Sequence, residues 1–165
     1  MLVAADAVVS LAIQAIANGA SPAAGAAVMI EDLRTNTRNV AMNYPQFIWQ
    51  NGQIKPWAEA TVHVMAHVVH YGSSVFEGIR SYETPKGPAI FRLGDHLKRL
   101  YMSARIYDME IPYTIDELAE ACRATIRANK LTKAYLRPVA YRGLGGFGLS
   151  AETPIDVAVA TWEMG

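Results

Sequence analysis

Tyr135 and Arg137 have residue types and a spacing that could bind an anion. They lie two positions apart in AYLRP, and in a β-strand such side chains point to the same side while Leu136 points to the other. A guanidinium beside a phenol suits a carboxylate. An exposed sheet face explains the pair almost as well, because charged side chains are usually at the surface.

Arg99 is a second candidate for binding an anion, and it lies in the basic sequence HLKRL of a predicted helix. An arginine that turns inward can hold a phosphate with its planar fork. Charged residues on a helix usually belong to a solvated face, however, and the residues alone favour that interpretation.

The sequence HYGSSVFEGIRSY, from His70 to Tyr82, shows neither a clean helical period nor a clean strand alternation. Its two glycines and its aromatic residues are compatible with an irregular connection or with a segment shaped to hold a ligand. Phe76, Glu77 and Gly78 are ambiguous when they are taken alone.

The glycine-rich sequence GLGGFG, at 143–148, matches the G-x-G-x-x-G fingerprint of dinucleotide sites. That fingerprint needs a helix that starts at its third glycine. Here AETP and a second predicted strand follow. We therefore expect a loop, either mobile or with its bare backbone close to a ligand, and not a dinucleotide site.

His63, His67 and His70 have a spacing that invites a metal site. Their β-branched surroundings predict a strand, however, in which 63 and 67 share a face and 70 does not. No Asp or Glu nearby completes a ligand set, and no H-E-x-x-H pattern is present. We expect histidines that pack or form hydrogen bonds.

The elements that must position these residues follow from periodicity and turn signals. Two helices are expected, one capped by Asp95 and continuing to Tyr107, and one opened by the capping box Thr114–Glu117 and ending near Asn129. Strands are predicted at 47–49, 54–57, 61–69, 79–82, 89–92, 134–141 and 155–162. Strands, two helices and then strands predict an α+β domain of two layers, with the sheet packed on the two helices.

The composition narrows the classes of partner and the cellular setting that fit the protein. The 15 basic and 15 acidic residues balance, which removes the electrostatic case for nucleic acid or an anionic membrane as partner. Cys122 is the only cysteine, so an intrachain disulfide is excluded and a reducing, cytoplasmic setting fits best. Residues 1–43 are rich in alanine, without a basic signal region or a 20-residue apolar run. We expect a weakly structured or disordered extension before a domain at 44–165.

Four stretches occur together in one order: VHVMAHVVHYGSSVFEGIRSY, GPAIFRLGDHLKRLYMSARIY, TIDELAEACRATIRANKL and AYLRPVAYRGLGGFG. From Phe47 to Gly165 they resemble the N-terminal half of branched-chain amino-acid aminotransferases, fold-type IV enzymes that use pyridoxal 5′-phosphate. The resemblance places the family's phosphate-binding arginine on Arg99, which replaces the solvated-face interpretation. It places residues of the substrate pocket on Phe76, Gly78, Tyr135 and Arg137, of which Arg137 would receive the substrate carboxylate.

The resemblance also implies a homodimer or a higher homo-oligomer, because Tyr71 and Leu149 match residues that reach the neighbouring subunit's active site. Phe147 and Met164 fall on pocket positions where the family varies. The chain departs from the family in its lysines, none of which matches the Schiff-base position: Lys55, Lys86, Lys98, Lys130 and Lys133. We expect that catalytic lysine and the large domain to lie beyond the C-terminus, and the isolated chain to be inactive.

The intact protein is then expected to move the amino group of leucine, isoleucine or valine to 2-oxoglutarate. Two alternatives remain within the fold family, a D-amino-acid aminotransferase and an aminodeoxychorismate lyase. A third is of another class: a stand-alone domain that binds a partner or a small acid without catalysis.

Overall fold

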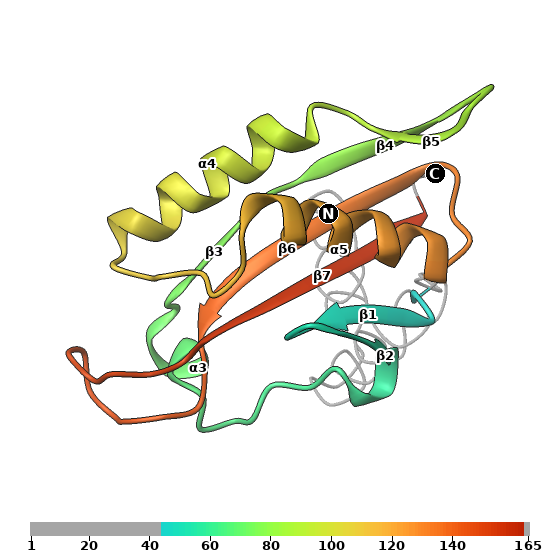
Figure 1. Cartoon of the computed structure of the whole chain (residues 1–165). Coiled ribbons are helices and arrows are strands. Elements are labelled where there is room, and N and C mark those ends of the chain that lie inside the picture. Colours follow the sequence, from blue (N-terminus) through green and yellow to red (C-terminus); the bar gives the residue numbers. More distant parts are fainter. Residues whose placement is uncertain (1–43, 164–165) are drawn as a thin grey trace, which may run out of the picture. The chain divides into compact units, whose positions relative to one another are not determined.

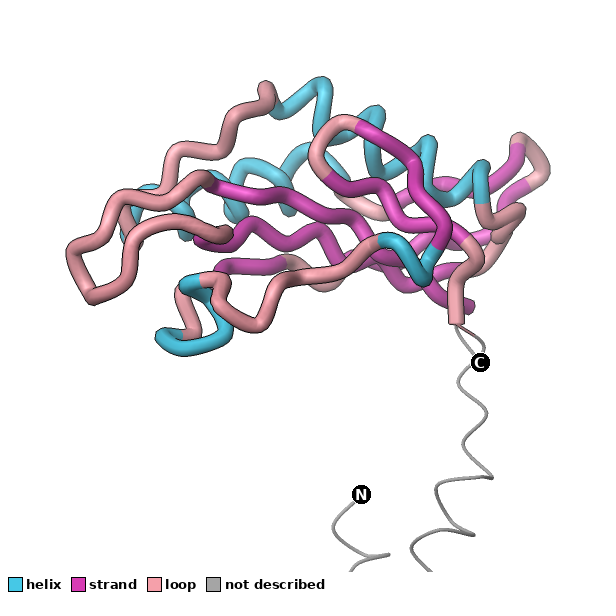
Figure 2. Tube along the Cα trace, turned by 90° about the horizontal axis from the view of Figure 1, so that it is seen from below, coloured by secondary structure: helices cyan, strands magenta, loops and turns pink. Residues whose placement is uncertain are grey.

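The structure is a computed structural model that describes residues 44–163. In this range one antiparallel sheet carries two long helices on one of its faces (Figures 1 and 2). The α+β architecture of two layers predicted from the sequence is confirmed. The expected extension at 1–43 and the candidate pocket residue Met164 lie outside the described residues.

The sheet has seven strands in the order β2-β1-β7-β6-β4-β5, and β3 pairs with β6 beside β4. The strands are β1 (Phe47–Gln50), β2 (Gln53–Pro56), β3 (Ser74–Phe76), β4 (Ile79–Thr84), β5 (Gly87–Ile90), β6 (Ala134–Arg142) and β7 (Ile155–Glu163). The helices are α3 (His67–Tyr71), α4 (Leu93–Ile106) and α5 (Ile115–Ala128), with a 3-10 turn η1 (Trp57–Glu59).

The long pair β6 and β7 shows why the two faces of the sheet differ. Leu136, Val157 and Val159 are fully buried beneath the helices. The alternate residues face the other way, and the register places Tyr135 opposite Trp162. The prediction that Tyr135 and Arg137 share one face, with Leu136 on the other, is therefore confirmed.

The stretch without a clear period, at 70–82, includes β3 and β4, which follow one another along β6. β3 pairs with residues 139–141 of β6, and β4 pairs with residues 134–136. Burial alternates through the break between them: Val75, Glu77 and Ile79 are buried, whereas Phe76 is exposed. This alternation puts Glu77 on the side of the helices, and Phe76 and Gly78 on the open side.

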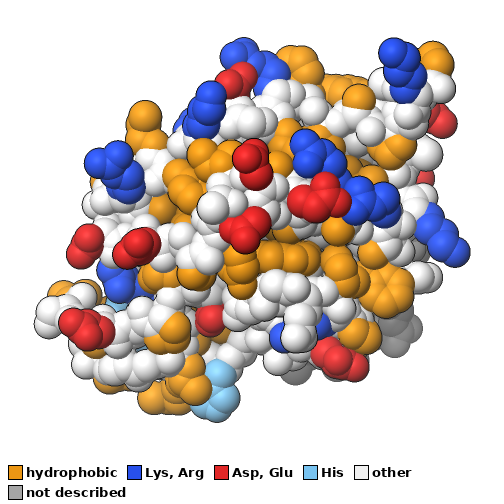
Figure 3. Space-filling model, in the orientation of Figure 1, with side chains coloured by type: hydrophobic (Ala, Val, Ile, Leu, Met, Phe, Trp, Pro, Cys, Tyr) orange, Lys and Arg blue, Asp and Glu red, His pale blue; other side chains and the backbone are white. Residues whose placement is uncertain are grey.

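Helix α5 begins as predicted. The Thr114 side chain accepts a hydrogen bond from the Glu117 backbone, and the Glu117 side chain accepts one from the Thr114 backbone, which completes the capping box. The helix buries Leu118, Cys122 and Ile126 against the sheet. Figure 3 shows acidic and basic side chains interspersed over the helix-bearing face, with apolar side chains between them.

The prediction that Asp95 caps α4 is wrong. The helix begins at Leu93, and its N-cap is Arg92, which has a left-handed backbone (φ 47°) and makes no side-chain cap. Asp95 lies in the first turn instead, where a carboxylate is favoured by the helix dipole, and it pairs with Arg92 at 2.8 Å.

The predicted strand at 61–69 is also wrong, since His67–Tyr71 forms the short helix α3. Gly72 adopts the left-handed conformation (φ 63°), and its N–H donates to the Val68 carbonyl, which closes a helical turn. The tertiary contact from His67 N–H to the Gly143 carbonyl therefore outweighs the strand preference of the β-branched residues.

The β4–β5 hairpin is tighter than expected, because Glu83 pairs with Pro88 and Thr84 with Gly87.

The face of the sheet away from α4 and α5 is partly crossed by residues 60–68 (Figure 2). Gln50 holds this segment by donating to the Thr61 carbonyl and to the Tyr141 hydroxyl. Among the described residues, no helix combines the length and the apolar character needed to cross a membrane.

Candidate active site

Arg137 lies at the centre of an aromatic group on the open face of the sheet. Its guanidinium carbon is 4.3 Å from the ring centre of Phe76, and its Nη2 donates to the Tyr135 hydroxyl at 3.1 Å. Tyr135 in turn stacks on Trp162, with ring centres 4.8 Å apart. Phe76, Tyr135 and Arg137, predicted separately as pocket residues, are thus brought together with Trp162 from three different strands.

Trp162 also belongs to this group, although no sequence motif predicts it. Its alternation within β7 does put it on the open face, but its position against Tyr135 depends on the β6–β7 register. A register between strands that are separated by a long loop leaves no short-range signal.

The guanidinium of Arg137 has an unused donor. Its Nε is buried without a hydrogen-bond partner, and none of the ion pairs within residues 44–163 includes this arginine. A buried donor without a partner costs about 1–3 kcal/mol, so such groups are rare unless a ligand or water satisfies them. The three rings of Phe76, Tyr135 and Trp162 stabilise the cation. The group is therefore suited to an anion such as a carboxylate.

Gly78 allows the Tyr135 phenol to lie directly against the backbone. A Cβ added at Gly78 would be 1.9 Å from the Tyr135 hydroxyl oxygen and 2.9 Å from Cζ. Only glycine permits this approach, and the approach places the hydroxyl where Arg137 can use it.

Arg99 lies on the other side of the strand segment that carries Phe76 and Gly78. It projects from α4 and pairs with Glu77, whose carboxylate accepts from Nε at 2.6 Å and from Nη2 at 2.5 Å. His96, one turn earlier, donates from Nδ1 to the same carboxylate at 2.9 Å. Arg99 is therefore not free in solvent, although 65% of its side chain stays exposed. No pattern in the sequence predicts Glu77 as its partner.

The environment of Glu77 favours its ionised form. Its pKa is lowered chiefly by the hydrogen bond from Arg99 and also by the one from His96, with burial opposing the shift. Only 4% of the residue is exposed. The buried carboxylate thus carries its charge because Arg99 and His96 of α4 both donate hydrogen bonds to it.

The stability of the fold should consequently depend on pH in the acid range. Since the folded pKa of Glu77 is depressed below its ordinary value of 4.5, its stabilising contribution is complete above that value and is lost as the pH falls through the folded pKa. We expect the unfolding free energy to decline more steeply in the wild type than in Glu77→Gln between about pH 6 and pH 3. Urea denaturation across this range measures both curves, and parallel curves would contradict the assignment.

The second group of predicted site residues lies beyond the far end of β6: Tyr71 is in α3, and Phe147 and Leu149 are in the glycine-rich loop. The rings of Tyr71 and Phe147 are 5.9 Å apart, and Leu149 is 86% exposed. Gly143, where this loop begins, lies six positions beyond Arg137, which corresponds to about 20 Å at about 3.3 Å per residue of strand. Within one copy of the chain, the predicted substrate-site residues therefore form two separate groups, and Arg99 lies on the other face of the sheet beside Glu77.

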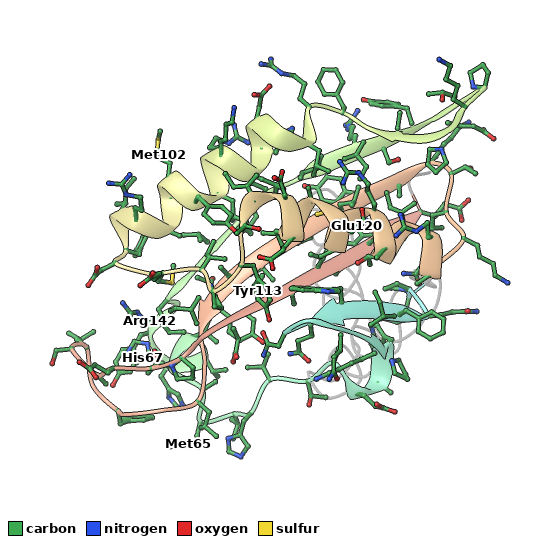
Figure 4. All side chains as sticks on the ribbon, viewed as in Figure 1. Met65, His67, Met102, Tyr113, Glu120 and Arg142 are labelled. Carbon is green, nitrogen blue, oxygen red and sulfur yellow. The ribbon has the colours of Figure 1, made fainter. Side chains whose placement is uncertain are left out.

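His67 anchors the glycine-rich loop that carries Phe147 and Leu149. It is buried, with Nε2 at 3.0 Å from the Gly148 carbonyl and Nδ1 at 2.8 Å from Ser73 Oγ. Since a carbonyl can only accept, Nε2 is the donor, and Nδ1 accepts from the Ser73 hydroxyl in the neutral ring. Arg142 adds a second anchor through the carbonyls of Tyr107 and Asp108. Figure 4 shows His67 and Arg142 at the end of β6, where the loop begins.

A substitution of His67 should loosen this loop. In His67→Phe the ring remains while both hydrogen bonds are lost, and we expect amide exchange at Gly145–Leu149 to become about 10-fold faster, as the loss of about 1.4 kcal/mol implies. Hydrogen–deuterium exchange measures the effect, and His63→Gln, at an exposed histidine, serves as control. Equal exchange in all three proteins would show that His67 does not anchor the loop.

His63 and His70 make their contacts with nearby backbone groups. His63 Nδ1 accepts from the Met65 backbone, and His70 Nε2 lies 2.9 Å from the Val64 carbonyl. Residues 44–163 contain no group of three His, Cys, Asp or Glu placed to hold a metal. As the sequence predicted, a strand and not a helix follows the glycine-rich loop.

Comparison with known proteins identifies the family. Residues 74–164 match the class IV amino-transferase family. The branched-chain-amino-acid aminotransferase of Pseudomonas aeruginosa is 49% identical over 119 residues, which cover 72% of this chain and 39% of that protein. The structure of the Escherichia coli enzyme of the same name superimposes with a TM-score of 0.71 at 47% identity, covering 73% of this chain and 40% of that one.

The branched-chain amino acid aminotransferase of Thermobaculum terrenum, solved in its pyridoxal-phosphate form, superimposes with a TM-score of 0.65 at 33% identity and covers 73% of this chain and 40% of that one. The chain thus spans about two fifths of the length of the aminotransferases it matches. The resemblance drawn from the four sequence stretches is confirmed. With a family match over more than half of its length, the chain belongs to the class IV aminotransferases.

Proposed function

We propose that this chain is part of a branched-chain amino-acid aminotransferase that moves the amino group of leucine, isoleucine or valine to 2-oxoglutarate with pyridoxal 5′-phosphate. The observation that carries the proposal is the Arg137 guanidinium, which is enclosed by Phe76, Tyr135 and Trp162, has a buried Nε without a hydrogen-bond partner and forms no ion pair within residues 44–163. The names of the matching relatives support the substrate class.

The donors of Arg99 fit the phosphate of that cofactor. A guanidinium has five N–H donors, of which Glu77 takes the one on Nε and one on Nη2, so three remain. Two of them, one on Nη1 and one on Nη2, lie on the Nη1–Nη2 edge, which matches a phosphate bidentately. A hollow of about 380 Å³ lies beside this arginine and is lined by Phe91, Arg92, Asp95, His96 and Arg99. The cofactor, when bound, supplies the electron sink for transamination.

The chain's own residues then bind and orient the amino acid. Arg137 holds the substrate carboxylate, and the Tyr135 hydroxyl orients the guanidinium. The rings of Phe76 and Trp162 exclude water and contact the aliphatic side chain. Among the described residues, none of the five lysines has a hydrogen bond or ion pair with Phe76, Tyr135, Arg137 or Trp162. We therefore propose that the lysine that attaches the cofactor lies outside residues 44–163.

The second group, Tyr71, Phe147 and Leu149, supports the proposal of a homo-oligomer. It is exposed and distant from Arg137 along the strand. We propose that it completes the site of a neighbouring copy, and that the assembled enzyme acts in the cytoplasm.

The decisive experiment is an assay of the complete protein with L-leucine, D-alanine and aminodeoxychorismate. We expect transfer from L-leucine to 2-oxoglutarate, whereas activity with D-alanine or aminodeoxychorismate alone would favour the alternatives of the same family. The 165-residue chain by itself should form no borohydride-reducible adduct with pyridoxal phosphate. An adduct on one of its own lysines would overturn the assignment of the catalytic lysine, and tight binding of 2-oxo acids without cofactor would favour a non-catalytic domain.

A further inference from the structure

We infer that Glu77 is a positioning residue, which holds the Arg99 guanidinium with its Nη1–Nη2 edge outward and ties this anion-binding edge to the strand that forms the substrate wall. The inference rests on the proposed function in one respect, because the anion is the phosphate of pyridoxal phosphate. It concerns a carboxylate that itself touches neither substrate nor phosphate.

The direction of the guanidinium follows from which atoms are occupied. Glu77 Oε1 accepts from Nε, and Oε2 accepts from Nη2, so the carboxylate covers one whole edge of the planar group. A long, flexible side chain that is 65% exposed would otherwise sample many orientations. Two parallel hydrogen bonds remove that freedom and leave one orientation of the remaining edge.

Glu77 can serve as an anchor because it is itself fixed. Its backbone N–H donates to the Pro138 carbonyl, which joins the residue to β6 next to Arg137. Its side chain is almost fully buried beneath α4, where the low dielectric strengthens its hydrogen bonds. His96 donates to Oε2 and limits rotation of the carboxylate.

The position of Glu77 in the sequence gives the anchor a second consequence. Its neighbours are Phe76, which contacts Arg137, and Gly78, against which Tyr135 packs. A phosphate held by Arg99 on one side of the segment therefore restrains, through Glu77, the backbone that shapes the carboxylate site on the other side. Both sites share this short segment of chain.

Glu77→Gln in the complete protein tests the inference. Glutamine keeps the size of the side chain, but only one oxygen can accept, and its amide would face an arginine donor. We measure the affinities for pyridoxal 5′-phosphate and for pyridoxal, whose ratio reports the contribution of the phosphate. We expect the ratio to fall about 10-fold with pyridoxal affinity unchanged, and Glu77→Asp, which keeps the charge, to restore part of it.

The matched control is Glu120→Gln. Glu120 accepts from Arg127 at 2.5 Å and from Arg123 at 3.4 Å, so it has the same chemistry as Glu77, but it lies on the exposed surface of α5 (Figure 4). This variant should leave the ratio unchanged. In the background of Arg99→Lys, Glu77→Gln should cause no further change if Glu77 acts through Arg99.

The outcomes separate the two proposals. A wild-type protein that binds pyridoxal as well as its phosphate contradicts the proposed function itself. A wild type that prefers the phosphate, with the preference retained in Glu77→Gln, contradicts only the role of Glu77. Should the variant fail to fold, ¹⁵N relaxation of the Arg99 Nε–H in the wild type decides: rigidity like that of the backbone supports the inference, and mobility like that of the exposed Arg105 contradicts it.

Discussion

Arg137→Met is expected to lower kcat/KM for L-leucine by about 10²–10³-fold, the loss of two charge-assisted hydrogen bonds to the substrate carboxylate. Most of the loss should lie in KM, because the carboxylate is held equally in the ground state and the transition state. Methionine keeps an unbranched side chain and replaces the guanidinium that lies over Phe76 by an uncharged thioether, which also packs favourably on aromatic rings. Since the variant also removes the buried Nε without a partner, we expect its unfolding free energy to equal or exceed that of the wild type.

Steady-state kinetics and thermal unfolding together test this expectation. Arg105→Met, at an exposed arginine in the last turn of α4, should change neither kcat/KM nor the unfolding temperature by much. Loss of stability in parallel with loss of activity would mean that Arg137 serves the fold and not the substrate. Residues of a binding site are expected to lower the stability of the free protein and to raise its affinity for the ligand.

Gly78→Ala is the second change with a large expected effect. The new methyl group would overlap the Tyr135 phenol, which cannot retreat freely because it stacks on Trp162. We expect kcat/KM to fall about 10–100-fold as Tyr135 and Arg137 move apart, with a stability loss of about 1–3 kcal/mol from overpacking. Kinetics with L-leucine and urea denaturation measure the two effects.

The controls for Gly78 use two other positions. Gly94→Ala in α4 meets no atom within 4 Å and should stabilise the protein by up to about 1 kcal/mol. Tyr135→Phe removes the hydroxyl that lies nearest to the new methyl group, so it should recover part of the stability when it is combined with Gly78→Ala. Additive losses in the double variant would place the origin of the effect elsewhere.

The elements that the sequence predicts well are those with local determinants. The capping box of α5 and its apolar stripe involve residues within four positions of one another, and the alternation of β6 and β7 is visible in each strand alone. The predictions at 61–69 and at Asp95 failed because non-local contacts prevailed. His67 forms its backbone bond with Gly143, and the Phe91 N–H donates to the Arg80 carbonyl two residues before α4 begins at Leu93.

The sequence alone determined the two-layer class, the shared face of Tyr135 and Arg137, and the family, because periodicity, capping and an ordered set of motifs are properties of neighbouring residues. Only the tertiary structure decided that Trp162 stacks on Tyr135, that the phenol of Tyr135 packs directly against Gly78, and that Glu77 binds Arg99. These contacts join residues 22 to 57 positions apart, and strand register and helix docking, which no local pattern encodes, determine which of them meet.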